Sequence, residues 1–195
     1  MKQILSILLG LLFISSASFA AGIWLDPWYG DSGLMNEVGC TYEYQCIDDG
    51  SIADSSDYVY HAGFSPGNVS PVYYLDNLPP EATSVNYVRI YYYAATNQVL
   101  VWNGHGYTAL SKRRITPVVY SWSGYYVDYD NPIFTPLLDY SWNHYSSRTY
   151  WDNPRTGTDW TVSEVNLLRA GYNLGFDDDG PKIGRIRVYV NYNTD

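Results

Sequence analysis

Two stretches of strict alternation constrain the fold of this chain more than any other feature. In Ser84–Ala95, the residues Val88, Ile90 and Tyr92 fall on one face, and Ile183–Tyr192 alternates in the same way. Successive side chains of a β-strand point to opposite faces, so each stretch predicts a long strand with one buried face. The outward-facing residues of these two predicted strands are Tyr87, Arg89, Tyr91, Tyr93, Arg185, Arg187, Tyr189 and Asn191.

Most of the remaining chain consists of shorter apolar and aromatic segments separated by turns rich in Gly, Pro, Asn and Asp. This pattern is typical of further short strands. Two of these segments are Thr41–Ile47 and Gln98–Trp102, and the second is expected to form a hairpin with the long strand before it.

One stretch, about 161–170, instead has apolar residues at helical spacing. Thr161 and Glu164 have the spacing of a capping box at the start of a helix, and Gly171 is suited to end it. We therefore predict an all-β fold: a single jelly-roll-like antiparallel β-sandwich with this one short helix.

The strongest compositional bias is toward tyrosine, with 22 Tyr, 7 Trp and 5 Phe against 2 Met. Aromatic residues suit half-buried pleated surfaces, and a Tyr hydroxyl tolerates contact with water. One interpretation is a sandwich that uses tyrosine in both its core and its surface. The other is an exposed aromatic surface that binds a partner.

Residues 1–20 have the pattern of a secretory signal peptide. Lys2 is followed by the apolar run Ile4–Ile14, and Ser18–Ala20 places small residues at the expected cleavage site. We expect a single domain at 21–195 that is secreted or held at the cell surface. No second apolar run follows, so we expect no membrane span.

The chain is acidic, with 11 Lys and Arg against 20 Asp and Glu and a formal net charge of −9. This balance argues against nucleic acid and anionic membranes as partners, since both attract basic proteins.

The segment Asn153–Gly171 has the pattern N-P-x-T-G-x-x-W-T-x-x-E-V-N-x-L-x-A-G. Together with Tyr44–Asp49, Asp57–Tyr60, Ala82–Val85 and Val188–Tyr192, it resembles a jelly-roll β-sandwich module of phage structural proteins and secreted environmental proteins. The resemblance covers nearly the whole domain. It implies the fold but no activity.

The two cysteines, Cys40 and Cys46, predict a local disulfide in an exported protein. On one straight strand their Cα atoms would be roughly 20 Å apart, beyond the ~7 Å that a disulfide spans. A disulfide therefore requires a bend near Thr41–Glu43. Cys46 also departs from the resembled module, which usually has a small apolar residue there.

Metal and catalytic signals are weak. Asp177, Asp178 and Asp179 either form an acidic turn or supply oxygen ligands to calcium, the one cofactor that the sequence suggests. The three histidines lack metal-ligand spacing. We therefore expect no enzyme.

The outward aromatic and basic residues are the candidate ligand-binding residues, because aromatic rings can stack on the apolar faces of sugars while polar groups bind hydroxyls. We expect a secreted, non-catalytic binding or adhesion module, with carbohydrate such as a glycan or surface polymer as the favoured ligand. The candidates are Arg89, Tyr91, Tyr93, Trp102, Arg187 and Tyr189.

The alternative function is a self-associating structural subunit of an extracellular surface layer, filament or virion-like particle. Such a subunit should have an unpaired edge strand or a terminal arm, and Ile23–Gly39 could be that arm. Trp24 and Trp28, within this segment, are expected to plug one edge of the core rather than to form a binding site.

Overall fold

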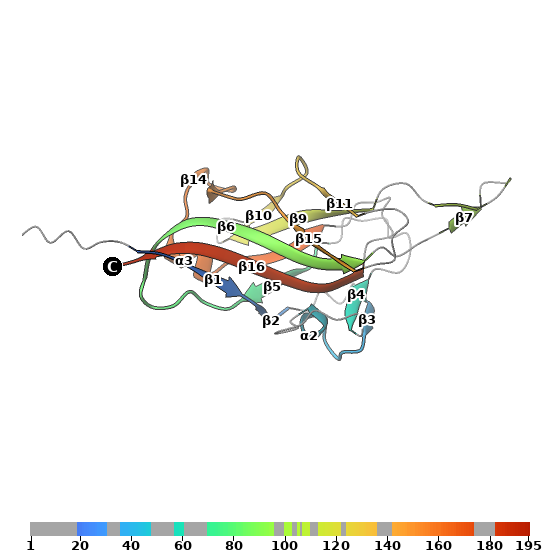
Figure 1. The fold of residues 1–195 in the computed structure, drawn as a ribbon, viewed down its shortest axis with the longest axis horizontal. Helices are drawn as coiled ribbons and strands as arrows, with labels where there is room; N and C mark the ends of the chain where they lie inside the picture. The colour runs from blue at the N-terminus through green and yellow to red at the C-terminus, as the bar shows by residue number, and fades with distance from the viewer. Residues whose placement is uncertain are drawn as a thin grey trace, which may run out of the picture.

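A computed structural model describes residues 19–30, 36–47, 57–60, 70–95, 100–102, 105, 107–109, 113–121, 124–135, 142–173 and 182–195 (Figure 1). The elements within them are β1 (Phe19–Leu25), β2 (Pro27–Tyr29), β3 (Asn36–Val38), α2 (Glu43–Ile47), β4 (Tyr58–Tyr60), β5 (Val72–Leu75), β6 (Ala82–Ala95), β7 (Leu100–Trp102), β8 (Tyr107–Ala109), β9 (Arg113–Ser121), β10 (Gly124–Val127), β11 (Ile133–Thr135), β12 (Asn143–Ser146), β13 (Asp152–Asn153), β14 (Thr158–Asp159), α3 (Val162–Asn166), β15 (Arg169–Asn173) and β16 (Lys182–Thr194).

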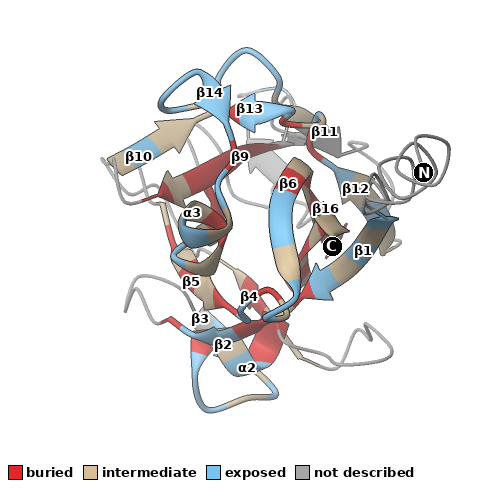
Figure 2. Ribbon diagram, turned by 90° about the vertical axis from the view of Figure 1, so that its left-hand side faces the viewer, coloured by how far each residue is buried: buried red, intermediate tan, exposed pale blue. Residues whose placement is uncertain are grey.

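The strands form two main antiparallel sheets. Sheet A has the order β12-β6-β16-β4-β3, with β1 also paired to β16, and sheet B has the order β10-β9-β15-β5-β2, with β11 also paired to β9. Viewed end-on, β6 and β16 lie on one side of the molecule and β9 and β5 on the other (Figure 2). The predicted all-β antiparallel sandwich is confirmed.

Four strand pairs give the sandwich its jelly-roll topology. The main strands pair from the outside of the chain inwards: β1 with β16, β5 with β15, β6 with β12, and β9 with β10. This nesting is that of a long antiparallel ribbon rolled into two facing sheets, which is how a jelly roll is built.

The two long predicted strands are β6 and β16, and they lie side by side along most of their length (Figure 1). Val88 and Ile90 of β6 and Val188 and Val190 of β16 are fully buried, as the alternation predicted. The core includes tyrosine as well as aliphatic residues. The hydroxyl of Tyr92 crosses from sheet A to donate a hydrogen bond to the Gly171 carbonyl of sheet B at 2.8 Å, which satisfies its polar end inside the core.

The predicted helix is present but shorter than expected. α3 ends at Asn166 and β15 begins at Arg169, so Gly171 lies in a strand and does not end the helix. A Cβ at Gly171 would overlap the backbone carbonyl oxygen of Pro71. The glycine is therefore explained by close packing of backbones rather than by a left-handed helix end.

A second short helix, α2, replaces the strand predicted at Thr41–Ile47. It contacts β2 of sheet B and β4 and β16 of sheet A, so it closes one side of the sandwich. Cys40 and Cys46 form a disulfide, with Cα atoms 5.4 Å apart, because the chain bends into this helix.

The described part of Ile23–Gly39 is paired within the body and is not an arm. β1 pairs with β16, β2 with β5, and β3 with β4. Phe19 and Ala20 are the first residues of β1, so cleavage after Ala20 would leave Ala21–Leu25 of this strand in place.

β7 pairs with β8 rather than with β6, so the hairpin predicted between β6 and Gln98–Trp102 is wrong. Among the described residues, neither helix has the length and apolar character needed to cross a membrane.

Candidate functional site

The outer face of sheet A brings together side chains from β1, β16, β6 and β12. Residues that face each other across the strands form three rows: Trp24–Tyr189–Arg89, Arg187–Tyr91–Ser146 and Arg185–Tyr93–His144. The two long strands are neighbours, as the carbohydrate hypothesis requires.

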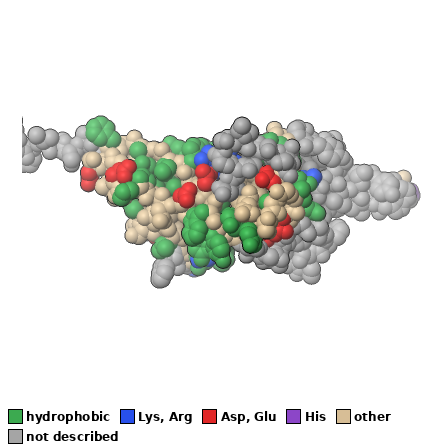
Figure 3. Space-filling view, turned by 90° about the horizontal axis from the view of Figure 1, so that it is seen from below, with side chains coloured by type: hydrophobic (Ala, Val, Ile, Leu, Met, Phe, Trp, Pro, Cys, Tyr) green, Lys and Arg blue, Asp and Glu red, His purple; other side chains and the backbone are tan. Residues whose placement is uncertain are grey.

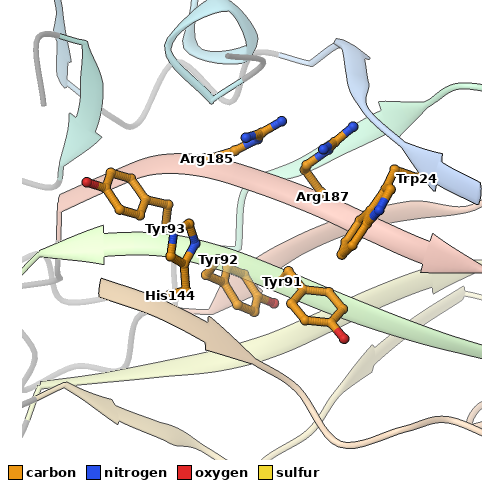
Figure 4. A pocket seen from close by; sticks show the side chains of 7 residues that line it. All are labelled: Trp24, Tyr91, Tyr92, Tyr93, His144, Arg185 and Arg187. Atoms are coloured by element: carbon orange, nitrogen blue, oxygen red, sulfur yellow. The ribbon is translucent and has the colours of Figure 1, made fainter. Parts of the chain in front are cut away.

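These rows surround an open pocket of about 230 Å³, which we call the sheet A pocket (Figure 4). Trp24 and Tyr91 lie next to each other at one end, with ring centroids 4.9 Å apart. Tyr93 and His144 lie at the other end, with centroids 4.8 Å apart. The residues lining the pocket are Trp24, Tyr91, Tyr92, Tyr93, His144, Arg185 and Arg187.

Each ring of the pocket is held by a neighbour. Trp24 also contacts Tyr189 edge-on at 5.1 Å, and Trp142 stacks on Tyr93 at 5.0 Å. The Tyr189 hydroxyl occupies the space that a Cβ at Gly22 would fill. Rings fixed in this way lose little freedom when a ligand stacks on them.

The side chain of Arg187 is held in place and neutralised by an ion pair with Asp26. Its guanidinium forms a bidentate ion pair with Asp26, through Nε to Oδ1 and through Nη2 to Oδ2 at 2.7 Å. The same guanidinium lies 5.1 Å from the centre of the Trp24 ring. Because bidentate pairing holds the group in place and cancels its charge, this end of the pocket favours an uncharged ligand.

Six residues were predicted to bind ligand, and the structure separates them into three groups. Tyr91, Tyr93 and Arg187 line the sheet A pocket. Arg89 and Tyr189 lie on the same face beside it. Trp102 belongs to the β7–β8 hairpin, drawn at the far end of the molecule in Figure 1, and its side chain is outside the described structure.

Sequence reasoning missed Trp24, His144 and Arg185 as pocket residues. Trp24 was assigned to the core edge, but it is 40% exposed, while Leu25 beside it is fully buried. Trp28 is also exposed, and its indole donates to the Leu75 carbonyl at 2.8 Å. Placing Leu25 on the core face would have turned Trp24 outward by simple alternation, which was the available signal.

The predicted calcium ligands, Asp177, Asp178 and Asp179, lie outside the described residues. In the described part of the chain, no three His, Cys, Asp or Glu side chains are grouped so that they could hold a metal ion.

Two fully buried carboxylates belong to the framework rather than to the pocket. Asp128 accepts hydrogen bonds from the Tyr150 hydroxyl at 3.0 Å and from Arg148 Nε at 2.9 Å. Burial, and then Asp128, raises the pKa of Tyr150 well above its ordinary value, so this hydroxyl keeps its proton and donates. Glu43 accepts from Tyr73 at 3.3 Å inside the core.

Comparisons with known proteins found no match for this chain among family models, curated proteins or solved structures.

Proposed function

We propose that this protein is a secreted, non-catalytic binding or adhesion module that binds carbohydrate in the sheet A pocket. The observation that carries the proposal is the open pair of rings, Trp24 and Tyr91, beside the guanidinium of Arg187. Aromatic faces pack on the apolar faces of sugars, and the polar groups between them bind hydroxyls.

The size of the pocket and the ion pair at its Trp24 end favour one neutral sugar unit of a longer chain. Its volume of about 230 Å³ is below the roughly 300–1,000 Å³ of pockets that enclose a whole small molecule. Most of a polymer would therefore stay outside. The Arg187–Asp26 pair has no net charge to attract an acidic ligand to the Trp24 end of the pocket, while Arg185 lines the pocket beside Tyr93.

Secretion is proposed on separate grounds. Residues 1–20 have the pattern of a signal peptide, and the Cys40–Cys46 disulfide is of the kind that persists in oxidising compartments. The resemblance of Asn153–Gly171 to a module of phage structural proteins and secreted environmental proteins also remains a proposal, which is based on the sequence motif.

The alternative, a self-associating structural subunit, is less well supported. The described part of the segment proposed as its arm is paired into both sheets. Light scattering on the purified protein tests the alternative directly, because a subunit of a layer or filament should form large assemblies.

A polysaccharide pull-down with ring-deletion variants tests the proposed function. Each stacked ring should contribute about 1 kcal/mol, so Tyr91→Ala with Tyr93→Ala should weaken binding roughly thirtyfold. Thermal melts should change little, since outward positions typically alter stability by about 0.5 kcal/mol.

Tyr129→Ala is the matched control, because Tyr129 is exposed and does not line the sheet A pocket. If the double variant binds as tightly as the native protein, the pocket is not the binding site. If it unfolds, the two rings belong to the framework.

A further inference from the structure

The outer face of sheet B has one continuous row of side chains that the proposed function does not use. Tyr29 of β2, Tyr74 of β5, Arg169 of β15, Tyr120 of β9 and Tyr125 of β10 are direct cross-strand neighbours in that order. At a strand spacing of about 4.8 Å, the row extends roughly 19 Å across the sheet. We call it the Arg169 row.

The guanidinium of Arg169, at the centre of the row, lies between two aromatic rings. Its guanidinium carbon is 3.8 Å from the centre of the Tyr74 ring and 4.7 Å from that of Tyr120. Outside them, Tyr29 lies 5.7 Å from Tyr74 and Tyr125 lies 4.6 Å from Tyr120, measured between ring centroids. Contact with a ring on each side restricts the guanidinium, and its N–H groups can donate hydrogen bonds to a ligand.

The charge of Arg169 is not neutralised by any residue that the structure describes. Arg148 and Arg187 form ion pairs with Asp128 and Asp26, whereas Arg169 makes no hydrogen bond or ion pair to a described residue. Asp76, two residues beyond Tyr74 in the chain, is exposed and forms no ion pair with it. A guanidinium has five donors in a planar fork that matches a carboxylate.

The Arg169 row has an open pocket of about 230 Å³ beside it. Tyr29, Tyr74 and Tyr125 supply ring surfaces, and Ser70 supplies a hydroxyl that also accepts a hydrogen bond from Asn173 at 2.6 Å. Tyr29 and Tyr125, at the two ends of the row, are each more than half exposed. Patches of hydrophobic side chains separated by a few acidic ones are visible on the surface of the molecule seen from below (Figure 3).

We propose that this second pocket binds a carboxylate-bearing sugar, with the carboxylate on the fork of Arg169 and the sugar ring against the flanking tyrosines. The planar fork favours a carboxylate, and the rings on both sides favour a ligand with a flat apolar face next to that group. A densely charged polyanion fits less well, because the net charge is −9 and the centre of the row has a single arginine, with no ion pair to a described residue.

The site is independent of the sheet A pocket and lies on the opposite sheet of the sandwich. Arg187 of the sheet A pocket is neutralised by Asp26, whereas Arg169 has no such partner among the described residues. A protein with both sites would connect a neutral and an acidic glycan.

Calorimetric titration with three probes tests the proposal on the native protein: a glucuronic-acid-terminated oligosaccharide, its methyl ester, and the glucose-terminated analogue. The affinity for the acid should be at least about tenfold higher than the affinity for the ester. The ester keeps the sugar ring but loses the charge-assisted hydrogen bonds of the carboxylate. The acid should also raise the melting temperature more than the ester does. Equal binding of acid and ester would overturn the proposal.

Variants assign the effect to Arg169. Arg169→Gln should abolish the preference for the acid, and Arg169→Lys should reduce this preference only in part, because lysine keeps the charge but loses the fork and the stacking. Tyr129→Ala should bind the acid normally, and so should Tyr91→Ala, which alters only the sheet A pocket. Unchanged binding by a folded Arg169→Gln protein would contradict the proposal, as would loss of acid binding in Tyr91→Ala. If Arg169→Gln does not fold, the comparison of acid with ester on the native protein decides.

Discussion

At the scale of single residues, Gly171 is structurally important, but for a different reason from the one that the sequence suggested. Gly171 was expected to end a helix in a left-handed conformation, but it lies in β15 against the backbone of Pro71. Gly157 does adopt a left-handed conformation, with φ of +71°, and it has nothing within 4 Å of where a Cβ would be. The two glycines are required for different physical reasons, space at Gly171 and backbone conformation at Gly157.

We predict that Gly171→Ala lowers the free energy of unfolding by about 2–3 kcal/mol, because the methyl group forces two strands apart. Gly157→Ala should cost roughly 1 kcal/mol, the price of a left-handed non-glycine residue. Urea unfolding of both variants measures the difference. Equal losses would mean that β15 and Pro71 are not packed as closely as the structure has them.

At the scale of elements, the polar side chains of the Asn153–Gly171 motif hold the local structure together. Asn153 is fully buried; its side chain accepts from the Arg155 N–H at 3.0 Å and donates to Glu164 at 3.0 Å. The buried indole of Trp160 donates to the Tyr150 carbonyl at 3.0 Å. The side-chain oxygen of Asn166 accepts from the Leu78 N–H at 2.8 Å. These contacts tie the turn, α3 and the neighbouring segments together, and none of these residues lines either pocket.

The capping box of α3 is the element-scale prediction that is simplest to test. Thr161 Oγ1 accepts from the Glu164 N–H at 3.1 Å, and Glu164 Oε2 accepts from the Thr161 N–H at 2.8 Å. Thr161→Ala should therefore destabilise the protein by about 1 kcal/mol. Ser163→Ala, at an exposed position in the same helix, is the matched control. Thermal melts that show equal stability for both variants would contradict the role of the cap.

At the scale of the whole molecule, buried tyrosines join the two sheets and make the fold sensitive to high pH. Burial raises the pKa values of Tyr73, Tyr92, Tyr150 and Tyr172 well above the ordinary value of about 10. In the unfolded chain these hydroxyls lose their protons near pH 10, whereas in the folded protein they keep them. Their stabilising contribution is therefore complete below about pH 10 and is lost as the pH rises toward the folded-state values.

We predict a cooperative alkaline unfolding above about pH 10, in which these tyrosines ionise only as the protein unfolds. Tyrosinate absorbance and near-UV circular dichroism, recorded together, measure the two events. Tyr125→Phe, at an exposed site, should leave the transition unchanged. Reversible ionisation of all tyrosines near pH 10 with an intact dichroism spectrum would contradict the prediction.

The sequence by itself determined which residues of β6 and β16 face the core, because alternation is a local property of a strand with one buried face. It also determined the start of α3, since a capping box lies within one helical turn, and it placed Arg89, Tyr91, Tyr93, Arg187 and Tyr189 on outward positions. Its errors occur where tertiary contacts outweigh local pattern. Thr41–Ile47 reads as a strand but is coiled into α2, which is closed by a disulfide and packed against both sheets.

Only the tertiary structure decided which outward residues meet. The sheet A pocket needs β1 beside β16, and the Arg169 row needs five strands in one order. Those neighbours are set by the nested pairing of the jelly roll, which joins strands far apart in the chain. The local pattern assigned Arg169 to the predicted helix at about 161–170, whereas it begins β15. No local pattern contains information about which strand lies beside which.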